Sequence, residues 1–111
     1  VITAQSGTDF FIEIAGADID ISLPAIQSGL RYRFYNASTA NTHTATIAST
    51  ADVMDGAIVE IGSTGRSFAS QGNVIFQATS LEGDMVELVS SGARWMVNGI
   101  TRVDNGITTS T

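Results

Sequence analysis

The single histidine is the first residue to consider, because imidazole serves both acid–base catalysis and metal binding near neutral pH. His43 lies in a threonine-rich stretch, between Thr42 and Thr44. Catalytic triads and metal centres need a nucleophile, a carboxylate or further ligands close to the imidazole, and the chain contains neither cysteine nor a second histidine. We therefore interpret His43 as a packed or surface residue of a strand, and we expect no catalytic residues and no enzyme activity.

Two pairs of aspartates are the next candidates, because calcium takes roughly six to eight oxygen ligands. Asp18 and Asp20 fall on one face of an expected strand, about 7 Å apart, and Asp52 and Asp55 form the second pair. Neither pair has the ligand spacing of an EF-hand, so we interpret both as solvated or turn-forming acids. The remaining acids are scattered singly and do not suggest the two facing carboxylates of a glycosidase. We predict no metal site.

Cofactor and sugar sites are the remaining chemical possibilities. Residues 62–67 are glycine-rich but lack the lysine and the strand-to-helix context of a phosphate-binding loop, so we expect a plain loop and no cofactor. Tyr32, Tyr35 and Trp95 could stack on a sugar, which keeps glycan recognition open. A lone tryptophan in a small β domain is nevertheless more often part of the core.

Charge and composition exclude several classes of partner. Eleven acids face five basic residues, all of them arginine, for a formal net charge of −6, and no basic run is present that could bind nucleic acid. No apolar run approaches the roughly twenty residues of a membrane span, so no membrane partner is expected. Arginine is favoured over lysine at interfaces because its planar group pairs with two acceptors. The five arginines therefore suggest contacts between subunits.

The elements follow from alternation of apolar and polar residues, interrupted by eleven glycines. The 111 residues predict one all-β domain over 1–111, an antiparallel sandwich or barrel-like fold of about nine short strands. Strands are expected at residues 9–15 and 18–23 as a hairpin, at 30–36, 42–48, 57–61 and 73–78, and at 85–90 and 95–98 as a second hairpin. A third hairpin is expected at 99–103 and 107–110, around the turn signal Asn105-Gly106.

The strand at residues 30–36 has two occupied faces, and only the second of them is amphipathic. Leu30, Tyr32 and Phe34 form the expected core face. Arg31, Arg33 and Tyr35 form the other, and we predict them as subunit-interface residues because this face has no other evident purpose.

The segment from Gly83 to Gly99, with Gly92 in its turn and Trp95 closing the hairpin, carries a resemblance to known proteins. It resembles a family of tailed-bacteriophage virion proteins whose domains end in a Gly-Asp-aromatic-Val-Glu-Leu-Val-Ser-Asp-Gly-x-x-Trp-x-Val-x-Gly hairpin. Residues 3–11, 21–25 and 28–34 resemble the opening strands of that family. Ser91 stands where the family usually has aspartate, and Met96 where a tyrosine is common.

The resemblance implies a structural role in a virion, usually as a homotrimer. The expected function is that of a capsid decoration, or cement, protein that binds the major capsid protein on the outer surface of the head and stabilises it. The alternative is a tail-fibre or adhesin-like tip domain that recognises a bacterial surface glycan. The chain is acidic, has no lysine and has no cysteine for disulfides. Its strands have a second apolar face in addition to the core face, and we expect a partner surface to cover that second face.

Overall fold

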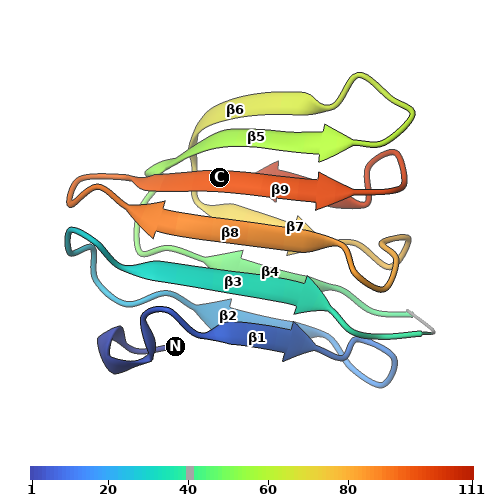
Figure 1. Cartoon of the computed structure of the whole chain (residues 1–111), viewed down its shortest axis with the longest axis horizontal. Coiled ribbons are helices and arrows are strands. Elements are labelled where there is room, and N and C mark those ends of the chain that lie inside the picture. Colours follow the sequence, from blue (N-terminus) through green and yellow to red (C-terminus); the bar gives the residue numbers. More distant parts are fainter. Residues whose placement is uncertain (40–41) are drawn as a thin grey trace.

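The computed structural model describes residues 1–39 and 42–111, and within them ten short strands form two facing β-sheets (Figure 1). A 3₁₀ turn, η1 (Thr3–Gln5), precedes the strands. The strands are β1 (Asp9–Ile12), β2 (Ile19–Ser22), β3 (Arg31–Asn36), β4 (Ala45–Ala48), β5 (Met54–Glu60), β6 (Arg66–Gln71), β7 (Asn73–Phe76), β8 (Met85–Ser90), β9 (Trp95–Thr101) and β10 (Ile107–Ser110).

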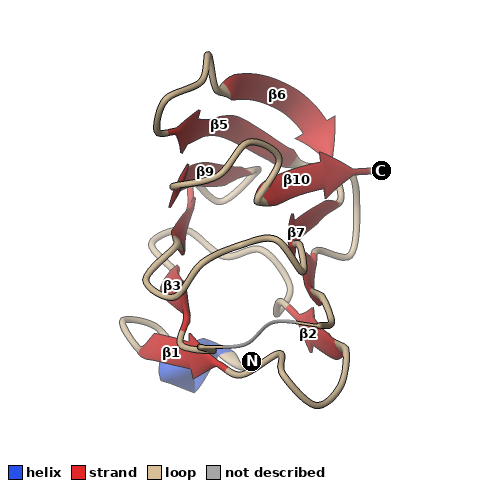
Figure 2. Cartoon of the chain, turned by 90° about the vertical axis from the view of Figure 1, so that its right-hand side faces the viewer, coloured by secondary structure: helices blue, strands red, loops and turns tan. Residues whose placement is uncertain are grey.

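The two sheets differ in size and form a sandwich, which Figure 2 shows from the side. The larger sheet has the order β1-β3-β8-β9-β5-β6, and the smaller has the order β10-β7-β4-β2. The predicted all-β fold is confirmed. The sheets are mixed rather than purely antiparallel, because β1/β3, β2/β4 and β5/β9 pair in parallel. Parallel pairing arises here because the chain crosses to the other layer before it returns beside an earlier strand.

The core lies between the sheets and receives every second side chain of the facing strands. Trp95 on β9 is fully buried, and its ring centroid lies 6.0 Å from that of Tyr32 on β3. The prediction that the tryptophan belongs to the core is therefore confirmed. The buried hydrophobic residues are Ile12, Ile14, Leu23, Leu30, Tyr32, Phe34, Ala45, Ile47, Met54, Ile58, Val74, Phe76, Val86, Leu88, Trp95, Val97 and Ile107.

The predicted hairpin of β8 and β9 is confirmed, with Ser90 paired to Trp95 across the turn. Gly92 adopts a φ of +97° in this turn, and Gly83 a φ of +96° in the turn that precedes β8. Both values lie in the left-handed region that glycine enters without steric cost. The local geometry thus accounts for both glycines.

Gly99 lies inside β9, where it pairs with Val86 of β8, and the hairpin extends beyond it to Thr101. A Cβ atom on Gly99 would lie 2.6 Å from Cδ1 of Ile58 on the neighbouring strand β5. The missing side chain therefore allows β9 to continue to Thr101 beneath a large core residue.

Two predicted hairpins are wrong. Strands β1 and β2 belong to different sheets, so the turn at Gly16 connects two layers. Strand β10 likewise leaves the sheet of β9 and pairs with β7. Asn105 does adopt the expected positive φ, +59°, but its N–H donates to the buried carboxylate of Glu60, 2.7 Å away, which fixes the turn against β5.

The glycine-rich stretch at residues 62–67 is only partly a loop. Arg66 and Ser67 begin β6, an edge strand that was not predicted. Its alternation is irregular and few of its side chains are apolar, so no period-2 signal marks it.

Candidate interaction surface

The outer face of the six-stranded sheet is the candidate functional surface. We define it as the side chains of β1, β3, β8, β9 and β5 that point away from the smaller sheet. Strand registers align these side chains in rows that run across the strands, because directly paired residues project to the same side. Three such rows differ sharply in chemistry.

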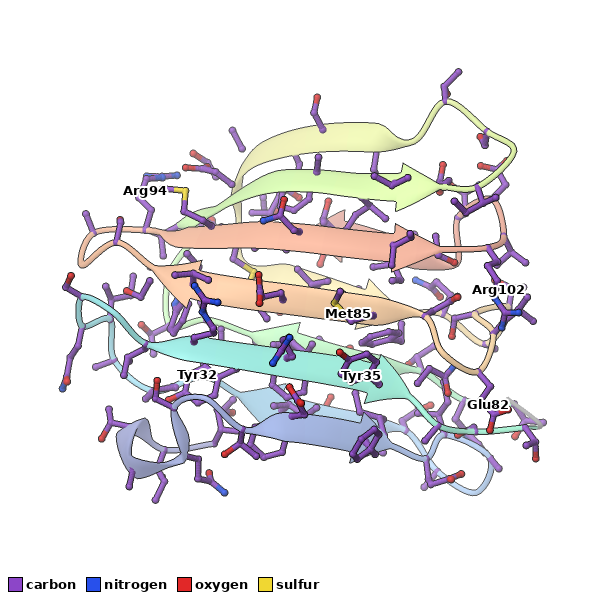
Figure 3. All side chains as sticks on the ribbon, viewed as in Figure 1. Tyr32, Tyr35, Glu82, Met85, Arg94 and Arg102 are labelled. Atoms are coloured by element: carbon purple, nitrogen blue, oxygen red, sulfur yellow. The ribbon has the colours of Figure 1, made fainter. Side chains whose placement is uncertain are left out.

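The first row, which we call the apolar row, crosses five strands. Its register pairs are Phe11 with Tyr35, Tyr35 with Met85, Met85 with Ile100, and Ile100 with Val59. Phe11 is 73% exposed, Val59 54% and Ile100 39%. The rings of Phe11 and Tyr35 are stacked, with centroids 5.7 Å apart, and Figure 3 shows Tyr35 beside Met85. Large side chains thus form a continuous line across the sheet, exposed at Phe11, Val59 and Ile100 and half-buried at its centre.

The second row is charged. Asp9, Arg33 and Glu87 are register partners on β1, β3 and β8. Nε of Arg33 lies 2.8 Å from Oδ1 of Asp9 and 3.9 Å from Oε2 of Glu87, while Nη1 of Arg31 lies 3.8 Å from that same Glu87 oxygen. Such exposed pairs contribute little to folding stability. Their consequence is that both acids already have arginine partners within one chain.

The third row contains Arg31, Val89, Met96 and Asp55. Arg94, which precedes β9, donates to both oxygens of Asp55, one of them 3.0 Å from Nη2, and the backbone N–H of Ser70 donates to Asp55 Oδ1. Hydrogen bonding from Arg94, followed by that from Ser70, lowers the pKa of Asp55 below its ordinary value. This cluster fixes the ends of β5, β6 and β9 to one another.

Part of this surface was predictable from the sequence. Arg31, Arg33 and Tyr35 do lie together along β3 on the outer face, with Tyr32 buried on the opposite side. Their role at an interface stays a prediction. Phe11, Met85, Ile100 and Val59 were missed, because only the pairing of strands distant in sequence brings them into line with Tyr35.

The candidate catalytic and metal-binding groups lie elsewhere. Nδ1 of His43 lies 3.3 Å from Oδ1 of Asp18, near the start of β4. The pKa of Asp18 is lowered, chiefly by the hydrogen bond from the backbone N–H of Thr44. Over residues 1–39 and 42–111, no three His, Asp or Glu side chains come close enough to hold a metal ion.

Two buried acids serve as structural acceptors. Asp84 accepts hydrogen bonds from the backbone N–H of Leu81 and from the hydroxyl of Thr101, at 2.9 and 2.6 Å. Glu60 lines a hollow of about 450 Å³ beside the β5–β6 hairpin, where it accepts from Asn105 and from Arg66. Both carboxylates thus hold connections between strands in place.

Comparison with protein families, with curated proteins and with solved structures finds no match for this chain. Across the described parts of the chain, the structure contains no helix with the length and apolar character of a membrane span. The outer face and the resemblance of the hairpin at residues 83–99 are therefore the two features that bear on function.

Proposed function

We propose that this protein is a bacteriophage capsid decoration protein, which binds the major capsid protein on the outer surface of the head as a homotrimer. The observation that carries the proposal is the apolar row, a line of large side chains across the outer face, three of them exposed. Extended exposed apolar patches are uncommon on monomeric proteins and mark contact surfaces. The resemblance of the hairpin to phage virion proteins supplies the kind of particle.

The proposed activity is binding without turnover. A protein that binds only the assembled shell stabilises that shell by mass action. A trimer would contact the shell at several points at once, so modest affinity at each point gives strong overall attachment. No cofactor or nucleic acid takes part in this mechanism.

Reconstitution on undecorated heads tests the proposal. The purified chain is added to heads that lack it, and binding is measured by co-sedimentation and shell stability by thermal disruption. We expect saturable binding to the outer surface and a higher disruption temperature. Heads that neither retain the protein nor gain stability would contradict the proposal.

Recognition of a bacterial surface glycan is the second candidate, favoured by the stacked and exposed pair of Phe11 and Tyr35. Aromatic rings beside the ion-paired Asp9 and Arg33 combine an apolar platform with polar groups, as sugar binding requires. Trp95 cannot contribute because it is fully buried. A glycan array probed with the chain and with Phe11→Ala distinguishes this candidate, since binding that Phe11→Ala abolishes would support it.

A further inference from the structure

The exposed hydrophobic residues are concentrated on one face of the molecule. Four of the seven large hydrophobic residues that are exposed in the described structure belong to the outer face. They are Phe11, Val59, Met96 and Ile100. Chance placement over the whole surface would scatter such residues singly, as monomeric proteins usually do.

The net charge, in contrast to the exposed hydrophobic residues, lies away from the outer face. The outer face and its flank carry three acids and three arginines, namely Asp9, Asp55, Glu87, Arg31, Arg33 and Arg94, and each acid lies within 4 Å of an arginine. The chain has eleven acids and five arginines, so eight acids and two arginines lie elsewhere. The outer face together with its flanking Arg94 therefore has no net charge, and the formal net charge of −6 lies on the rest of the molecule.

We propose that the outer face is the surface through which copies of this chain contact one another. Two copies of an acidic protein repel wherever their acidic surfaces meet, and like charges in a contact oppose binding. The outer face is neutral and its ions are already paired, so a second copy covers the apolar row without bringing unpaired like charges together. A strongly charged partner would find no net charge on this face to attract it.

The row geometry suits repeated contact between copies. The apolar row spans four inter-strand spacings, about 19 Å, and it lies beside the charged row at a fixed register. In a cyclic trimer, each copy turns the same face towards the axis and contacts different parts of its two neighbours. This inference rests on the proposed trimeric function, since it assigns the surface that forms the trimer.

Sedimentation velocity and light scattering on the purified chain, from roughly 1 µM to 100 µM, test the inference. Ile100→Glu is the test variant, and Leu81→Glu is its control, because Leu81 is equally exposed, 38% against 39%, but lies in the loop between β7 and β8. We expect the wild type to associate, and Ile100→Glu to raise the dissociation constant by about tenfold or more. Leu81→Glu should associate like the wild type.

Ile100→Thr keeps a β-branched residue in the strand and provides a second test should the glutamate variant fail to fold, as judged by circular dichroism. We expect a severalfold weaker association for it. A wild type that stays monomeric at the highest concentration would overturn the inference. A folded Ile100→Glu, or an Ile100→Thr, that associates like the wild type would overturn it too.

Binding to undecorated heads is measured separately on the same samples. A wild-type chain that associates through Ile100 but does not bind heads would refute the proposed function, while the assignment of the contact surface would still be supported. A monomer that binds heads would refute the contact surface alone.

Discussion

At the residue scale, Asp55 has the clearest electrostatic role on the outer face. The pKa of Asp55 in the folded state is lowered, chiefly by hydrogen bonding from Arg94. The ionised carboxylate therefore stabilises the fold, and this contribution is present in full at any pH above the ordinary pKa of an aspartate. That contribution is lost as the pH falls through the lowered pKa. We therefore expect Asp55→Asn to unfold at a lower temperature than the wild type at pH 7, with the two curves converging below about pH 4.

Thermal unfolding followed by circular dichroism from neutral to acid pH measures this difference. Asp20→Asn is the control, because it removes an exposed carboxylate of β2 outside the cluster. A constant difference between Asp55→Asn and the wild type at every pH would contradict the role assigned to the pair.

Asp84 is the residue on which the connection before β8 depends most. Its carboxylate is almost fully buried and accepts hydrogen bonds from Leu81 and Thr101. Asp84→Asn replaces one acceptor by a donor and should cost about 2 kcal/mol of unfolding free energy. Thr101→Val removes one donor and should cost about 1 kcal/mol. Urea unfolding measures both, and an Asp84→Asn as stable as the wild type would show that the carboxylate is not needed.

At the scale of elements, the sequence predicted local pairing well and distant pairing poorly. The β8–β9 hairpin was predictable because its strands are adjacent and Gly92 marks the turn. Alternation also placed Tyr32 in the core and Arg33 outside. Alternation cannot say which strand pairs with which, so the parallel pair of β1 and β3, and with it the alignment of Phe11 with Tyr35, had no sequence signal.

The failed hairpin at Asn105 has a specific physical cause. An Asn-Gly pair favours a turn, but it does not determine which sheet the next strand joins. Here the carboxylate of Glu60, 45 residues earlier in the chain, accepts the N–H of Asn105 and holds the turn against β5. Ile107 then enters the core from the other layer, where it is fully buried opposite Phe76.

The close approach of β5 and β9 gives a test at this scale. A Cβ atom on Gly56 would lie 1.9 Å from the carbonyl oxygen of Val97, so the parallel pair cannot form unchanged with any larger residue. Gly56→Ala should cost roughly 3 kcal/mol or more of unfolding free energy. Gly16→Ala is the control, because its Cβ would meet nothing within 4 Å. Chemical unfolding that finds the two variants equally stable would refute this packing.

At the scale of the whole molecule, the neutral outer face and the acidic remainder determine how assembly should respond to salt. Two copies of the chain, each with a net charge of −6, repel by a few kcal/mol in water of low ionic strength when their charges lie about 20 Å apart. Added salt removes this repulsion, because the screening length falls from about 30 Å at 0.01 M to about 3 Å at 1 M. The ion pairs of the outer face lie within each copy and not between copies. We therefore expect salt to tighten association between copies, by roughly tenfold or more over this range.

The variant Asp20→Asn supplies the control, because it removes an exposed acid of β2, which belongs to the smaller sheet. Its association should exceed that of the wild type at low salt and match it at high salt, where the repulsion is already screened. Sedimentation velocity over the same salt series measures both proteins. Association that weakens as salt is added would indicate ion pairs between copies, and the contact would then have to involve a charged surface other than the outer face.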